Sequence, residues 1–82
     1  MEFFIGQIIL MPNRVIPKYF FVCDGRELII GDQPALAAVL GYNYKNLEDT
    51  FNLPTKISDV EGYSYCICYG GIYPERDENE SF

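Results

Sequence analysis

The sequence contains no histidine and no tryptophan. Histidine is the usual general base near neutral pH and the commonest protein ligand of metal ions, so its absence removes both roles. A serine–histidine or cysteine–histidine nucleophile cannot be assembled within one subunit, and a second copy would bring no histidine either. No pair of acidic residues sits in an apolar run that would raise one carboxyl pKa for acid catalysis. We therefore expect a protein that is not an enzyme and that holds no cofactor and no metal ion.

Basic residues are scarce, since six lysines and arginines accompany twelve acidic residues, for a formal net charge of −6. Such a chain lacks the basic patch that binds phosphate backbones, which argues against nucleic acid as a partner. No stretch approaches the roughly 18 apolar residues of a membrane-spanning helix, so a membrane is not expected as a partner either. The N-terminus opens with Glu2 instead of a basic segment, and Gly6-Gln7 interrupts its apolar run, so no secretion signal is expected.

Aromatic surface, by contrast, is abundant: seven tyrosines and six phenylalanines occur in 82 residues. A chain this short forms one domain with a marginal core, and it cannot hide so many rings completely. Rings left at the surface tend to mark an interface. We assign residues 1–74 to a single domain and residues 75–82 to an acidic C-terminal tail. The charged residues of that tail are Glu75, Arg76, Asp77, Glu78 and Glu80.

Short strand patterns alternate with turn residues along most of the chain. β-Branched and aromatic residues predict strands over residues 4–10, 19–23, 27–30 and 63–69. A further short extended piece at 51–54 ends at Pro54. The fold class expected is α+β, a small domain of short, mostly antiparallel strands with one two-turn helix.

The helix is predicted over residues 33–40. Leu36, Val39 and Leu40 share one face at helical spacing. Asp32 is suited to the N-cap position, and Gly41 is suited to the left-handed position that follows a helix. A helix of two turns is not stable alone, so its apolar face must plug a small core.

Cys23, Asp24 and Gly25 lie between two of the predicted strands. Asp-Gly is a strong turn dipeptide, because glycine tolerates a positive φ and aspartate can bond the backbone of the turn. We expect a hairpin turn here. An adjacent carboxylate raises a thiol pKa, which opposes thiolate formation, so Cys23 is expected to pack and not to react.

Cys66 and Cys68 are two residues apart on a predicted strand and point to the same face. Two thiolates on one face could begin a zinc site, but four ligands are normally needed, and only Cys23 and carboxylates remain. Packing against the core is the preferred interpretation. A disulfide from Cys23 to either of the other two cysteines stays open as an alternative.

The predicted strand 63–69 has two apolar faces, with Tyr63, Tyr65, Ile67 and Tyr69 on one side. One short helix can cover only one side of such a strand. We expect the tyrosine face to be covered by another subunit or by a partner, and the tyrosines that could form the rim are Tyr42, Tyr44 and Tyr73. The alternative is a monomer whose tyrosines are half buried under residues 42–62.

The order of several short motifs resembles the phage tail collar domain, over about residues 5–77. These motifs are Ile5-Gly6-Gln7-Ile8, Pro17, Cys23-Asp24-Gly25-Arg26-Glu27-Leu28, the helix ending Leu40-Gly41, Tyr44, and Thr50-Phe51-Asn52-Leu53-Pro54. The chain departs from the family pattern at Tyr19-Phe20, where Gly-Trp is usual, at residues 45–49 and at residues 55–58. The fold implied is tail-collar-like, in a short stand-alone member of the family.

The resemblance implies a structural protein that assembles with itself or docks on a phage-tail-like particle. It favours a trimer, with other tail proteins as further partners, in the cytoplasm or on the particle. The alternative function is a small phage or host protein that captures a signalling molecule or modulates a defence system, because stacked tyrosines can grip a base or a sugar ring.

Overall fold

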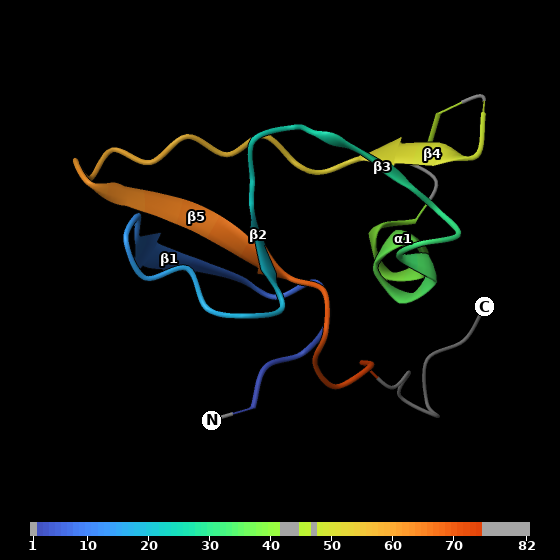
Figure 1. Ribbon diagram of the computed structural model, residues 1–82, viewed down its shortest axis with the longest axis horizontal. Coiled ribbons are helices and arrows are strands. Elements are labelled where there is room, and N and C mark those ends of the chain that lie inside the picture. Colours follow the sequence, from blue (N-terminus) through green and yellow to red (C-terminus); the bar gives the residue numbers. More distant parts are fainter. Residues whose placement is uncertain (1, 42–44, 47, 75–82) are drawn as a thin grey trace, which may run out of the picture.

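A computed structural model of the chain describes residues 2–41, 45–46 and 48–74 (Figure 1). Within them it has five short strands and one helix, in the order β1 (Ile8–Pro12), β2 (Phe20–Val22), β3 (Glu27–Ile29), α1 (Pro34–Leu40), β4 (Thr50–Asn52) and β5 (Tyr63–Cys68). All strand pairs are antiparallel. The predicted α+β class is confirmed.

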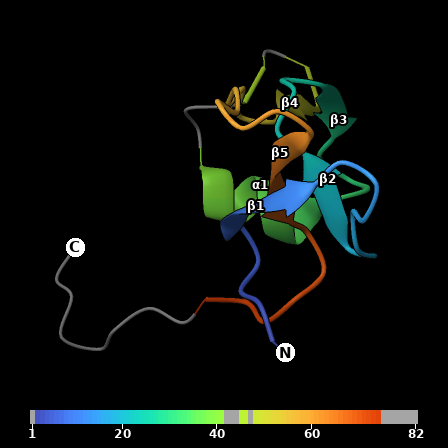
Figure 2. The same cartoon turned by 90° about the vertical axis from the view of Figure 1, so that its left-hand side faces the viewer.

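The strands form two separate sheets. A three-stranded sheet has the order β1-β5-β2, with Ile9 opposite Cys66 and Phe21 opposite Ile67. A two-stranded sheet pairs β3 with β4, with Leu28 opposite Phe51. In Figure 2 the two-stranded sheet lies above the three-stranded one, and the N-terminal segment and the segment after β5 descend together on the other side. An isolated bridge between Phe4 and Ile72 joins these two segments.

A bulge fixes where β1 begins. The N–H of Gly6 donates to the carbonyl oxygen of Cys68 (2.9 Å), while the N–H of Cys68 donates to that of Gln7 (3.0 Å), so two residues oppose one. Gly6 has φ 91°, as expected for the first residue of a glycine bulge. A β-carbon on Gly6 would also lie 2.5 Å from Cγ1 of Val39. The strand predicted over 4–10 is therefore corrected to Ile8–Pro12.

The helix is present, but its N-cap prediction was wrong. The cap residue is Gln33, and no side chain bonds to the first turn; Pro34 stands at its start, where a missing N–H has no cost. Gly41 has the positive φ expected after the helix (72°), but its ψ of −168° is not that of the left-handed helical position; its N–H donates to the carbonyl oxygen of Ala37 (3.0 Å). Leu36 is completely buried. No helix of the described residues is long and apolar enough to cross a membrane.

β5 separates two clusters of buried side chains. The first, the helix-side cluster, consists of Ile5, Cys23, Leu36, Phe51, Leu53 and Ile67. The second, the cysteine-side cluster, consists of Phe20, Cys66 and Cys68. Because side chains alternate along a strand, Ile67 faces the helix while its two cysteine neighbours face the other way. Both faces of β5 are thus covered within one chain.

Candidate functional site

The Cys23-Asp24-Gly25 turn is closed by its own side chains. Gly25 has φ 78°, which confirms the positive φ expected there. The N–H of Arg26 donates to Oδ1 of Asp24 (3.1 Å), and Nη2 of Arg26 forms an ion pair with Oδ2 (2.9 Å). These bonds to Arg26 lower the pKa of Asp24, and the carboxylate in return raises the pKa of Arg26. The carboxylate that stands beside the thiol is therefore engaged by a guanidinium.

The turn does not make the hairpin that the sequence predicted. β2 pairs with β5 and β3 pairs with β4, so the two strands on either side of the turn belong to different sheets. The local prediction of turn chemistry was correct, whereas the pairing was wrong. Only long-range contacts decide which strand pairs with which, and β5 lies some 40 residues further along the chain than the turn.

The structure brings the Cys23-Asp24-Gly25 turn and the Phe51-Asn52-Leu53-Pro54 segment together. Nδ2 of Asn52 donates to the carbonyl oxygen of Gly25 (2.9 Å), and the N–H of Leu53 donates to that of Arg26 (2.9 Å). Phe51 and Leu53 are buried, while Pro54, which follows them, is partly buried. A β-carbon on Gly25 would collide with Oγ1 of Thr55. Residues 23–26 and 51–55 therefore form one clasp that joins the two sheets, and its polar groups are used in holding the fold.

The cysteines show no sign of activation. Cys23 is 3% exposed, and burial, then the nearby Cys66, then Asp24 raise the pKa of its thiol to about 11. Burial also raises the pKa of Cys66. All three cysteines are free thiols, so the disulfide alternative is not realised. No group of three His, Cys, Asp or Glu side chains comes together within the part of the chain that the structure describes.

The tyrosines predicted to bind a partner fall into three groups. Tyr65 and Tyr69 are partly buried and pack against the helix-side cluster. Tyr63 is 41% exposed and Tyr73 is 52% exposed. Tyr42 and Tyr44 lie outside the described residues. The premise that the tyrosine face lacks cover within the chain is wrong, because the helix covers this face while residues of the N-terminal half, among them Phe3, Ile9 and Ile16, cover the other.

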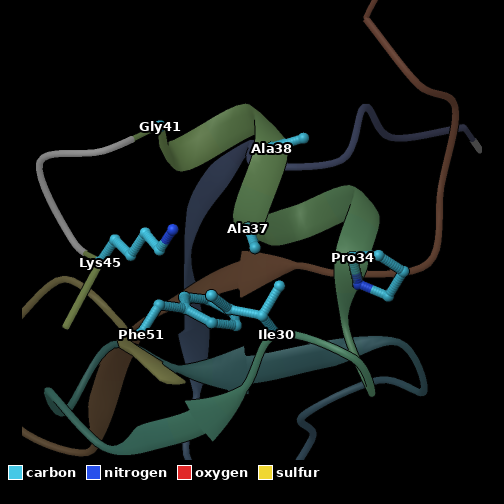
Figure 3. Close-up of a pocket in the computed structure, with 7 residues that line it drawn as sticks. All are labelled: Ile30, Pro34, Ala37, Ala38, Gly41, Lys45 and Phe51. Carbon is cyan, nitrogen blue, oxygen red and sulfur yellow. The ribbon is translucent and has the colours of Figure 1, made fainter. Parts of the chain in front are cut away.

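A shallow apolar pocket of about 350 Å³ lies between the helix and the two-stranded sheet (Figure 3). Phe51 and Ile30 face the helix across it, Ala37 points into it, and Lys45 reaches in from the end of the helix. Pro34 closes the opposite end. Sequence reasoning missed this pocket, since the only available signal was the small residues of the helix, which read equally well as helix formers.

A second pocket, of about 390 Å³, lies where the N-terminal segment meets the segment after β5. Phe3, Tyr19 and Ile72 contribute apolar walls, and Lys18 and Glu2 bring opposite charges to its lining. Gly71 must stay small there, because a β-carbon would collide with the carbonyl oxygen of Phe3.

The comparison with protein families supplies a family for this fold. The model described as Phage Tail Collar Domain matches residues 6–60, well over half of the 82 residues. The chain belongs to the phage tail collar domain family. The matched span includes α1, β1 to β4 and the clasp, while β5 follows it. Comparisons with curated proteins and with solved structures found no match.

Proposed function

We propose that this chain is a non-enzymatic structural module that acts by binding other proteins in a phage-tail-like particle. The family match over residues 6–60 carries the proposal, because tail collar domains form a structural family. The state of the motif residues supports it. The polar groups of the clasp are bonded to each other, and the thiol of Cys23 has its pKa raised away from the range of a nucleophile.

The exposed apolar side chains are consistent with this role. Phe4, Ile57 and Val60 are 52%, 84% and 46% exposed, and Tyr19, Tyr63 and Tyr73 are exposed as well. A single exposed apolar side chain needs no explanation, but several large ones on so small a body favour contact with other proteins. Partners of this kind are further copies of the chain or other tail proteins, on the particle or in the cytoplasm before assembly.

The test is the composition of tail particles. Particles would be purified on a density gradient from cells that carry the gene for the chain and from cells that lack it, and the chain would be quantified by mass spectrometry. We expect a fixed number of copies per particle, with defective particles in the deletion strain. Particles of normal number and activity that contain no copies would overturn the proposal. A Leu36→Ala variant, expected to be unstable, serves as the control for a requirement that the domain be folded.

The ligand-binding alternative has one observation in its favour, the apolar pocket beside Lys45. A flat, largely apolar ring fits such a pocket, since the apolar walls can hold the ring. Thermal shift against nucleotides and sugar phosphates tests it. A shift that Ala37→Leu abolishes and Ile57→Ala retains would support a ligand site, because Ala37 points into the pocket (Figure 3), whereas the exposed Ile57 does not line it. No shift with any compound counts against this function.

A further inference from the structure

We propose that the free edge of β1 pairs with the same edge of a second copy, in antiparallel fashion about a two-fold axis at Ile9. β1 is an outer strand, because the sheet order is β1-β5-β2 and β1 is paired on one side only. The inference does not depend on the tail role. It concerns which backbone groups of this strand have partners.

The alternation of hydrogen bonds shows which groups of β1 point outward. The carbonyl oxygen of Gln7, just before β1, accepts from the N–H of Cys68 on β5. The backbone N–H and C=O groups of the odd-numbered residues Ile9 and Met11 therefore point toward β5. In an antiparallel pair the intervening residues direct their N–H and C=O groups away. Ile8 and Leu10 therefore present two donors and two acceptors at the edge. Within the described residues, no hydrogen bond joins these four groups to another residue.

Each end of this edge is closed to further pairing. Pro12 has no N–H to offer, and its carbonyl oxygen accepts from the N–H of Val15 (3.0 Å). At the other end Gly6 directs its N–H to Cys68 in the bulge. The open edge is thus limited to a stretch of three residues, 8–10, which a short matching strand can complete.

A second copy matches this stretch by symmetry. With Ile9 on the axis, Ile8 lies opposite the partner's Leu10, and Leu10 lies opposite the partner's Ile8. Each of the two pairs exchanges two hydrogen bonds, so all four open groups are used and none is left over. The resulting sheet has six strands and is continuous through both copies. Isologous pairing of this kind closes on itself and does not propagate into fibres.

Charge and side chains also allow the pairing. The strand Ile8–Pro12 has no charged residue, although edge strands are commonly protected by one. Leu10, which is 39% exposed, lies on the face of Tyr65 and would contact the partner's Ile8. Each copy carries a net charge of −6, so the copies repel one another at a distance. Association should therefore strengthen as salt screens that repulsion, the opposite of what an ionic interface does.

Sedimentation velocity of the purified chain tests the pairing. Because the contact is small, the chain would be examined from about 10 μM to about 1 mM, the range of weak complexes, at low and high salt. We expect a monomer–dimer equilibrium that shifts toward dimer with salt. Leu10→Lys should weaken it about tenfold or more, since the two new lysines approach each other diagonally across the axis. Ile29→Lys, at an exposed position of the other sheet, is the matched control and should leave it unchanged.

Amide hydrogen exchange provides a readout that needs no variant. The N–H groups of Ile9 and Met11 bond within the monomer and should be protected at every concentration. Those of Ile8 and Leu10 should become protected only where the dimer forms. A monomer at the highest concentration, a trimer, or protection of Ile8 and Leu10 that ignores concentration would each overturn the proposal. None of these results would affect the test of the tail role, which depends on particle composition.

Discussion

The two core clusters lie against opposite faces of one strand, yet they are built differently. The helix-side cluster combines a helix, both sheets and the clasp, and it includes the large, fully buried Leu36, Phe51 and Ile67. The cysteine-side cluster has three buried residues, and partly buried side chains from the N-terminal third of the chain complete its cover. The comparison teaches that a list of helices and strands does not by itself show which faces are covered. The helix covers one face of β5, whereas side chains of β1 and β2, with Phe3 and Ile16 from irregular segments, cover the other.

The residues that the family model matches belong mainly to one of the two clusters. Four of the six residues of the helix-side cluster fall within residues 6–60, namely Cys23, Leu36, Phe51 and Leu53. On the cysteine side only Phe20 does so, because Cys66 and Cys68 follow the matched span. The residues that define the family thus organise the helix side, and we expect the stability of the domain to be concentrated there.

The largest effect expected is that of Leu36→Ala. This side chain is completely buried in the helix-side cluster, and removing it leaves a cavity, so the free energy of unfolding should fall by about 2–5 kcal/mol. Cys66→Ala, equally buried on the cysteine side, removes one atom and should cost about 1 kcal/mol. Urea denaturation of both variants measures the asymmetry. Equal losses would show that the two clusters contribute alike.

Gly25→Val should have the next largest effect on stability, because it disrupts the clasp that joins the two sheets. The positive φ of Gly25 strains any residue with a β-carbon by about 1–3 kcal/mol, and the collision with Thr55 adds to it. Asp24→Asn keeps the turn bond to Arg26 and is the matched control, with an expected loss below about 1 kcal/mol. If the two variants melt at the same temperature, the clasp does not have the importance assigned to it.

The sequence was informative wherever local chemistry decides the outcome. The helix, the positive φ of Gly41 after it, the positive φ of Gly25 and the burial of Cys66 and Cys68 all follow from short-range rules. The clasp could not be derived that way, since it joins residues more than 25 positions apart, as Asn52 and Gly25 show. The order of the motifs in the family resemblance was the only signal that they belong together.

The failures have a common physical cause. The hairpin was wrong because strand pairing is a long-range choice. The cover of β5 was misjudged because side chains of the N-terminal third were not counted as cover for its cysteine face, which leaves the helix to cover the tyrosine face. Ile16, in the loop between β1 and β2, packs on the cysteine side although it belongs to no strand. The free edge of β1 could not be recognised either, because the order β1-β5-β2 places the first and last strands side by side.

The thiol of Cys23, in the helix-side cluster, should make the stability of the chain depend on pH. Its pKa is raised from 9.0 to about 11 in the folded chain, so between these values the folded state holds a proton that the unfolded state has lost. Stability should therefore fall as pH rises from about 9 to 11, by about 1 kcal/mol at pH 10. Cys23→Ala should remove this part of the pH dependence, and Cys68→Ala, on the other side of β5, should retain it. Identical pH profiles for the two variants would contradict the role of Cys23.

The smallest effect expected belongs to the ion pair of Asp24 with Arg26, at the outer surface of the clasp. Because the folded chain lowers the pKa of Asp24, the pair adds stability above the pKa of the unfolded chain, about 4, and loses it as pH falls through the folded value. Both side chains are close to half exposed, at 45% and 44%, so solvent screening should limit the contribution to about 0.2–1 kcal/mol. Comparing wild type with Asp24→Asn by urea denaturation isolates the charge, since asparagine can still accept the bond from the N–H of Arg26. The difference in stability should be present at pH 6 and shrink toward pH 3, and it should also shrink in high salt. A difference that stays constant over this range would mean that the carboxylate acts through the shape of the turn and not through its charge, and the clasp would then be held by its backbone bonds and by Gly25 alone.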